Sequence, residues 1–204
     1  MNSMENNIPI TIITAAFRSK GLLNVFEILK KQEYQNFIHI IVNDGQSDIR
    51  EVMKDRGVLD KERFIDLPER LGGFGGWARN IGVMAAKTDW VIFHDDDNEW
   101  KSNHLRIMVD EIKKDSSLNL VATDCLVKGK KNLDYKHIRK CVFAPQNIDL
   151  GQILYKKDLF FKHGFFYPRG EHRITFDWEI INRMRNEPMK IIHEASFIFH
   201  HRRR

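Results

Sequence analysis

Short apolar runs alternate with helix-like segments through the first 126 residues of the chain. Residues 8–15 and 37–43 are rich in β-branched side chains and almost entirely apolar, which is typical of strands buried on both faces of a sheet. Between them, residues 20–32 carry apolar side chains at helical spacing. This order predicts an α/β fold with a mostly parallel central sheet and helices on both faces, because parallel strands need crossover connections.

The same reading assigns the remaining elements. In the first half we expect strands at 63–67, 89–94 and 118–126, and helices at 48–56, 77–87 and 102–114. The helix over 77–87 places Trp77, Ile81, Met84 and Ala85 along one stripe, which predicts its buried face. The second half is less regular, and we expect a loop or hairpin over 128–149, a strand at 151–155, helices at 157–163 and 176–186, and a last strand at 189–200.

Size and composition bound the domain count and the location. A chain of 204 residues with 42% hydrophobic and 30% charged residues suits one domain, residues 1–204. No apolar stretch approaches the ~20 residues of a membrane-spanning helix, and Met1–Asn7 lacks the apolar core of a signal peptide. We therefore expect a cytoplasmic protein, in which the isolated Cys125 and Cys141 are reduced.

The positive charge leaves several partners open. The net charge is +5, and basic residues gather at 128–131 and at Arg202–Arg204. These clusters leave peripheral contact with the inner face of a membrane open, beside the simpler reading of solvated loops. The other basic residues are dispersed among acids, so we expect no nucleic-acid partner. The irregular second half leaves a homodimer open.

An acidic triplet, Asp95-Asp96-Asp97, directly follows the predicted strand at 89–94. In extended backbone Asp95 and Asp97 point to one side, where two carboxylates about 6 Å apart repel by roughly 3 kcal/mol at an effective dielectric near 20. A divalent cation removes this repulsion, and oxygen ligands favour Mn²⁺ or Mg²⁺. The alternative is an acidic turn in which Asp97 caps the next helix.

Other polar or flexible segments follow neighbouring predicted strands. They are Thr14–Arg18, Asn43-Asp44-Gly45 and the glycine-rich stretch 72–76. In open α/β sheets ligands bind beyond the carboxyl ends of the strands, so these segments and the acidic triplet are expected to form one site. The glycines do not form a nucleotide-binding P-loop, because no Gly-Lys-Ser/Thr follows them.

Four segments resemble motifs of family 2 glycosyltransferases, in that family's order. They are ITIITAAFRS (10–19), IIVNDGQSD (40–48), LGGFGGWARNIGVMAAKTDWVIFHDDDNEW (71–100) and TFDWEI (175–180). The resemblance covers about residues 8–180 and implies one GT-A (Rossmann-like) domain. It also implies that residues 1–100 bind a nucleotide sugar and that residues 101–204 form the acceptor side.

The chain departs from the family pattern at three places. Ala15-Ala16-Phe17-Arg18 stands for the family's Pro-Thr-Tyr-Asn, Asn43 for the first Asp of Asp-Asp-Gly, and Phe176 for the Glu that precedes the catalytic Asp. These departures put the donor-base pocket in question and leave Asp44 and Asp177 as the acidic residues of their motifs.

The resemblance implies a role for each candidate residue. The donor-binding residues are expected to be Thr14, Ala15, Phe17, Asp44, Arg79, Asp95 and Asp96. The metal ligands are expected to be Asp95, Asp97 and His200, and the general base is expected to be Asp177. Simpler roles remain for three of them: a turn residue for Asp44, a first-turn helix residue for Asp177, and an exposed side chain for His200.

These roles imply inverting transfer from a nucleoside diphosphate sugar to an unknown hydroxyl acceptor, such as a glycan or a lipid-linked acceptor, with Mn²⁺ or Mg²⁺ on the diphosphate. We expect a UDP-sugar as the donor, and guanine or thymine in place of uracil stays open. The altered nucleotide loop keeps a catalytically silent nucleotide-binding or scaffold protein as an alternative. A sugar-phosphate nucleotidyltransferase is a weaker alternative, because no activating-loop motif is present.

Overall fold

The first half of the sheet is built on β1 (Ile10–Ala16), whose side chains are nearly all buried. β1 pairs in parallel with β2 (Phe37–Asn43) and with β4 (Trp90–Phe93). β2 in turn pairs in parallel with β3 (Glu62–Asp66). The carboxyl ends of these four strands therefore lie at the same edge of the sheet, as the apolar runs predicted.

The second half of the sheet is mixed. β8 (Ile153–Lys156) lies between β4 and β6 (Leu120–Lys128) and runs antiparallel to both. β9 (Met189–His200) pairs in parallel with β6, and β5 (Glu99–Trp100) pairs antiparallel with β9. β7 (Lys136–Arg139) forms a hairpin with β6. The strand order is β3-β2-β1-β4-β8-β6-β9-β5, with β7 beside β6.

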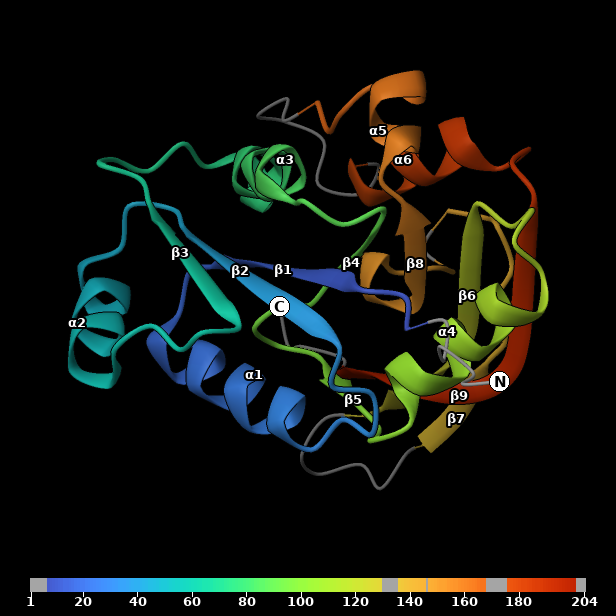
Figure 1. Ribbon diagram of the computed structural model, residues 1–204, viewed down its shortest axis with the longest axis horizontal. Coiled ribbons are helices and arrows are strands. Elements are labelled where there is room, and N and C mark those ends of the chain that lie inside the picture. The colour runs from blue at the N-terminus through green and yellow to red at the C-terminus, as the bar shows by residue number, and fades with distance from the viewer. Residues whose placement is uncertain (1–6, 130–135, 146, 168–175, 201–204) are drawn as a thin grey trace, which may run out of the picture.

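Helices cover both faces of this sheet in the computed structural model, which describes residues 7–129, 136–145, 147–167 and 176–200 (Figure 1). The helices are α1 (Ser19–Lys30), α2 (Ser47–Arg56), α3 (Gly76–Ala85), α4 (His104–Lys114), α5 (Asp158–His163) and α6 (Phe176–Met184), with short 3₁₀ turns η1 (Gly73–Gly75) and η2 (Leu150–Gln152). α3, α5 and α6 lie on one face, and α1, α2 and α4 lie on the other (Figure 1).

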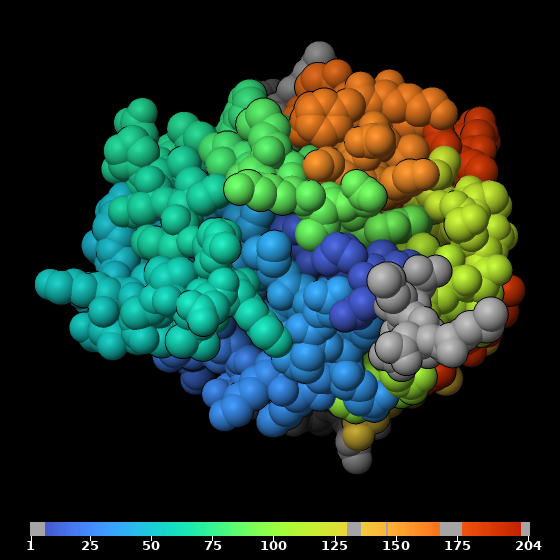
Figure 2. All heavy atoms as spheres, viewed as in Figure 1, coloured from blue at the N-terminus to red at the C-terminus, as the bar shows by residue number. Residues whose placement is uncertain are grey.

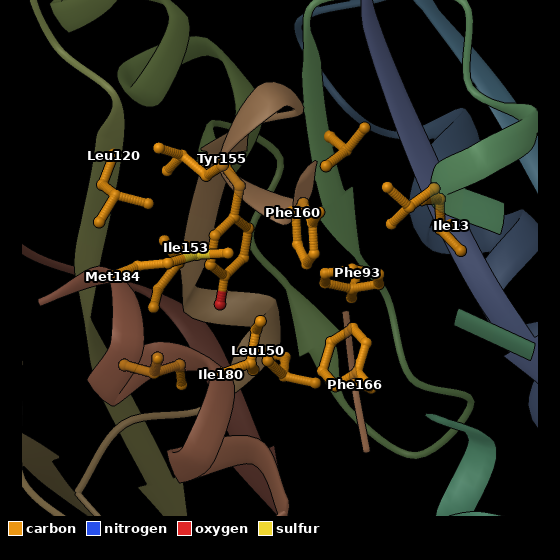
Figure 3. Packing of buried hydrophobic residues seen from close by; sticks show 14 of the residues in the cluster. Ile13, Phe93, Leu120, Leu150, Ile153, Tyr155, Phe160, Phe166, Ile180 and Met184 are labelled. Atoms are coloured by element: carbon orange, nitrogen blue, oxygen red, sulfur yellow. The ribbon is translucent and has the colours of Figure 1, made fainter. Parts of the chain in front are cut away.

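An aromatic cluster joins the two halves of the sheet. The ring of Phe93 on β4 lies 5.8 Å from the ring of Tyr155 on β8, and the same distance from that of Phe160 on α5. Ile180 and Met184 of α6 pack into the same core (Figure 3). This packing fixes the first turn of α6, which carries Asp177, relative to the end of β4.

Helix α3 buries a different face from the one predicted. Trp77 and Met84 of the expected stripe are 45% and 60% exposed. The buried side chains belong instead to Ala78, Arg79, Asn80 and Val83, beside the buried Gly82. The reason is close approach, since a Cβ on Gly82 would lie 2.4 Å from Cγ2 of Ile13 on β1. Glycine at position 82 lets α3 lie close to β1, while the large side chains of Trp77 and Met84 remain exposed.

The α/β fold class is confirmed, and the remaining differences are local. The two-residue β5 was not predicted, and Gly151, expected to begin a strand, lies in η2. Figure 2 shows α3 and the α5 segment side by side on the surface. Beneath them the buried side chain of Asn80 donates to the carbonyl of Phe166 at 2.9 Å. Among the described residues no helix is long and apolar enough to cross a membrane. Lys130, Lys131 and the terminal arginines lie outside the described residues.

Candidate active site

A pocket of about 550 Å³ opens beyond the carboxyl ends of β1, β2 and β4. It is lined by Ala15, Ala16, Phe17, Arg18, Asp44, Arg70, Gly72, Gly73, Phe74, Gly75, Arg79, Asp95, Asp96 and Asp97. The three strand-end segments, the glycine-rich stretch and the first turn of α3 therefore meet in one cavity. This is the convergence expected from the sequence.

A larger pocket of about 760 Å³ lies elsewhere, near α1 and β2. It is lined by mixed apolar and charged side chains, and Arg56 within it already forms two hydrogen bonds with the carboxylate of Glu62. The smaller pocket is the candidate site, because it collects the acidic triplet and Asp44 at the sheet edge where α/β folds bind ligands.

Arg79, which is buried, and Asp95, which is partly buried, form an ion pair in the candidate site. Nη2 of Arg79 donates to Oδ1 of Asp95 at 2.6 Å, and Nη1 donates to the carbonyl of Phe74 at 2.9 Å. Burial opposes ionisation of Asp95, but the charge and hydrogen bond of Arg79 outweigh it, so the pKa of Asp95 lies below its usual value. Asp95 is therefore an anion, and Arg79 anchors the loop before α3.

Arg18 lies across the other two carboxylates of the triplet. Its Nε donates to Oδ2 of Asp96 at 2.9 Å, and its Nη2 contacts Oδ1 of the same carboxylate. Nη2 also lies 3.3 Å from Oδ2 of Asp97. A bidentate arginine–carboxylate contact has a fixed geometry as well as complementary charge, so the acidic turn is ordered by Arg18.

Asp44 is buried at the end of β2 and holds the glycine-rich stretch. Its carboxylate accepts from the backbone N–H of Leu71 at 2.7 Å and from that of Gly72 at 3.1 Å. An ionised carboxylate has about four acceptor positions, so Asp44 keeps the capacity to accept a further hydrogen bond. Phe17 is 41% exposed at the pocket, with the guanidinium carbon of Arg70 4.6 Å from its ring centre.

Three predicted site residues do not line this pocket, namely Thr14, His200 and Asp177. Thr14 is fully buried and its hydroxyl is hydrogen-bonded to Nε2 of His39 at 2.9 Å. His200, at the end of β9, has Nε2 2.9 Å from Oε1 of Glu99 on β5. Among the described residues His200 does not join the acidic triplet in a group of three or more side chains that could hold a metal ion.

Asp177 approaches the site from α6 and is half-buried. Burial raises the pKa of Asp177 to about 6; the charge of Arg79 opposes this shift, and that of Asp95 adds to it. Asp149, which precedes η2, was not predicted. Burial and the negative charges of Asp95 and Asp177 raise its pKa to about 7. Two carboxyl groups that titrate near neutral pH thus lie close to the arginine–aspartate pair, as general acids and bases do.

The acidic triplet does not form a ready divalent-cation site as it is arranged. The described residues contain no group of three or more His, Cys, Asp or Glu side chains placed to hold a metal ion. Asp95 is committed to Arg79, and Asp97 lies beside Arg18. The expected Mn²⁺ or Mg²⁺ on Asp95, Asp97 and His200 stays a prediction.

Local sequence signals existed for part of what was missed. Asp149 and Gln152 form a capping box around η2, with Asp149 accepting from the Gly151 N–H at 3.1 Å and Gln152 accepting from the Asp149 N–H at 2.9 Å. The Asp-x-x-Gln spacing is readable from sequence as a helix start. The charge environment of Asp149 is not, because it depends on how β8 brings η2 to the end of β4.

Comparison with known proteins agrees with the geometry. The model of "Glycosyl transferase family 2" matches residues 11–194. The teichoic acid poly(glycerol phosphate) polymerase of Staphylococcus epidermidis is 28% identical over 69% of this chain and 20% of its own length. The amylovoran biosynthesis glycosyltransferase AmsB of Erwinia amylovora is 31% identical over 49% of this chain and 34% of its own length.

A solved structure shares the fold. S. aureus TarS 1–349, in complex with UDP-GlcNAc, superposes with a TM-score of 0.73 at 18% identity, over 96% of this chain and 59% of that one. The chain thus spans a fifth to a third of the two curated relatives above and about three fifths of TarS 1–349. Because the family model covers most of its length, this chain belongs to glycosyl transferase family 2.

Proposed function

We propose that this chain transfers a sugar from a nucleoside diphosphate sugar, with UDP as the leaving nucleotide, to a hydroxyl acceptor with inversion at the anomeric carbon. The observation that carries the proposal is the single pocket in which Asp44, Phe17 and the acidic triplet meet, with Asp177 close to the Arg79–Asp95 pair. The UDP-GlcNAc complex of TarS supports the choice of donor.

In this proposal the first half of the chain binds the donor. Asp44 accepts a hydrogen bond from the uracil ring N–H with the acceptor capacity that its two backbone contacts leave. Phe17 offers an exposed ring for stacking against the base. Arginines at the pocket face the diphosphate, because a planar guanidinium binds two phosphate oxygens at once.

Asp177 is the proposed general base. Its carboxylate takes the proton of the acceptor hydroxyl while the acceptor oxygen forms a bond to the anomeric carbon and the bond from that carbon to the diphosphate breaks. UDP leaves with the electron pair of the broken bond. A pKa of about 6 suits this role, because the group is ionised at neutral pH and is still basic enough to accept a proton.

The direct test measures UDP release and UDP binding by the purified chain. UDP-sugars are incubated with and without acceptor mixtures, and UDP binding is measured by calorimetry with and without Mn²⁺. The proposal expects UDP to bind and a UDP-sugar to be consumed. UDP binding without turnover of any UDP-sugar would favour the silent nucleotide-binding alternative, and the absence of both would reject the proposal.

A further inference from the structure

Arg18 lies beside Asp97, one of the residues expected to bind a divalent cation. It bridges Asp96 and Asp97, since Nε and Nη2 contact the first carboxylate and Nη2 lies 3.3 Å from the second. With Asp95 paired to Arg79, each of the three carboxylates in the acidic triplet has an arginine beside it. Two guanidinium groups thus offset most of the negative charge of the three carboxylates that would attract a cation.

The backbone holds Arg18 in this position. Arg18 is the residue before α1, and Gly21 in the first turn of α1 lies against the acidic turn. A Cβ on Gly21 would lie 2.4 Å from the carbonyl oxygen of Asp96, so only glycine allows this approach. The start of α1 and the acidic turn are thus in direct contact, and the Arg18 side chain needs no rearrangement to reach both carboxylates.

Arg18 still presents donors to the pocket. Its side chain is 42% exposed and lines the cavity. Its hydrogen bonds use Nε and Nη2, and in the described part of the chain Nη1 has no hydrogen-bond partner. Arg70 lines the same cavity above the ring of Phe17, with no carboxylate at ion-pair distance among the described residues. Two guanidinium groups can therefore face an anion there.

We propose that Arg18, assisted by Arg70, binds the diphosphate of the donor in place of a divalent cation, so that nucleotide binding by this chain does not require metal. This inference rests on the proposed function. Each of the three arginines at the pocket has its own role. Arg79 holds Asp95 and the loop before α3 in place, and Arg18 pairs with the acidic turn while its Nη1 binds the phosphates. Arg70 binds the phosphates from the side of Phe17.

The test is UDP binding by calorimetry, in EDTA and in Mn²⁺, for the wild type, Arg18→Ala, Arg18→Lys and Arg106→Ala. Arg106 is the matched control, because it forms an arginine–carboxylate pair with Glu33 and does not line the pocket. The UDP affinity of the wild type is expected to be the same, within about threefold, in EDTA and in Mn²⁺. The control is expected to match the wild type in both buffers. Arg18→Ala is expected to bind at least tenfold more weakly in EDTA.

Mn²⁺ is expected to restore UDP binding to Arg18→Ala, because that variant leaves the carboxylates of Asp96 and Asp97 without their arginine. Arg18→Lys keeps the charge but loses the planar guanidinium, so its UDP affinity in EDTA should lie between those of the wild type and Arg18→Ala. It replaces the alanine variant in the test if that variant does not fold. Three results would overturn the inference: a wild type that binds UDP only with Mn²⁺, Arg18→Ala binding UDP in EDTA as the wild type does, or no gain from Mn²⁺ in that variant. If the wild type binds no UDP in either buffer, the proposed function itself fails.

Discussion

The two halves of the sheet bring carboxyl groups of opposite character to the site. From the first half, Asp95 is paired with Arg79, and Asp96 and Asp97 lie under Arg18. From the second half, Asp149 and Asp177 have no such arginine contact among the described residues, and burial raises the pKa of each. The first group is suited to binding and positioning, and the second to proton transfer.

The difference follows from how each half is wound. Parallel strands β1, β2 and β4 end at one edge, so loops and a helix N-terminus gather there with their arginines. In the second half, antiparallel β8 carries η2 to the end of β4, and the aromatic core brings α6 beside it. Carboxyl groups that arrive against an apolar core are desolvated, and desolvation raises their pKa.

The largest effect should come from Asp177→Asn. We expect the turnover rate to fall by about 10²- to 10⁴-fold, because the acceptor hydroxyl loses its proton acceptor, while UDP affinity stays unchanged. Since Asp177 acts ionised, the wild-type rate should rise as pH increases through about 6 and level off above it. Turnover is measured by UDP release and affinity by calorimetry.

The matched control for that prediction is Asp158→Asn, the same change in the first turn of the neighbouring α5, where the side chain is exposed. It should leave turnover within twofold of the wild type. Equal losses of turnover in the two variants, or an Asp177→Asn variant with the wild-type rate, would show that Asp177 is not the general base. The two halves of the sheet would then not differ in their role in proton transfer.

A smaller effect is expected from Gly82→Ala in the first half. The added methyl group would lie 2.4 Å from Cγ2 of Ile13, so α3 must shift from β1, at a cost of about 1–3 kcal/mol in the free energy of unfolding. Met84→Ala on the exposed side of the same helix should change that free energy by less than about 0.5 kcal/mol. Urea denaturation measures both, and a reversed ranking would restore the predicted stripe as the buried face.

The smallest effect concerns Asp149→Asn, and its sign depends on pH. The folded-state pKa of Asp149 is about 7, above its unfolded value of about 4, so the folded state holds the proton more tightly. Its contribution to stability is therefore full below the unfolded pKa and is lost progressively as pH rises from that value to about 7. Asparagine still caps η2 but carries no charge. Relative to the wild type, the free energy of unfolding of the variant should therefore be at least about 1 kcal/mol more favourable at pH 8 than at pH 5, which corresponds to roughly 2–4 °C in Tm.

Thermal unfolding at the two pH values decides that prediction. A gain that does not depend on pH would show that the buried charge of Asp149 costs the fold nothing. A loss at both pH values would show that the carboxylate, and not the cap that asparagine keeps, holds η2 in place.

Most of the fold could be predicted from sequence, and so could the part of the candidate site at the ends of β1, β2 and β4, because both are local. Buried parallel strands appear as apolar runs, and the residues that directly follow them lie at the ligand-binding edge; Asp44 and Asp95 were found in this way. The face of α3 was not predictable from apolar spacing, since the close approach at Gly82 favours small residues over large ones.

What the sequence missed depends on contacts between distant segments. Arg18 was expected near the site as part of the segment Thr14–Arg18, but its contact with Asp96 was not predicted, because that contact spans 78 residues of the chain. Asp149 could be read as a helix start but not as a group with a raised pKa. Thr14 was expected at the donor, whereas strand alternation turns its side chain to His39.

The antiparallel direction of β8 determines which segment of the chain can vary in length. Because β8 runs antiparallel to both of its neighbours, the segment that leads into it can lengthen or shorten without altering the winding of β3, β2, β1 and β4. A change in the length of that segment would therefore leave in place the strand ends that line the pocket. The pairing of β4 with β8 would then stay fixed while the segment before β8 varies.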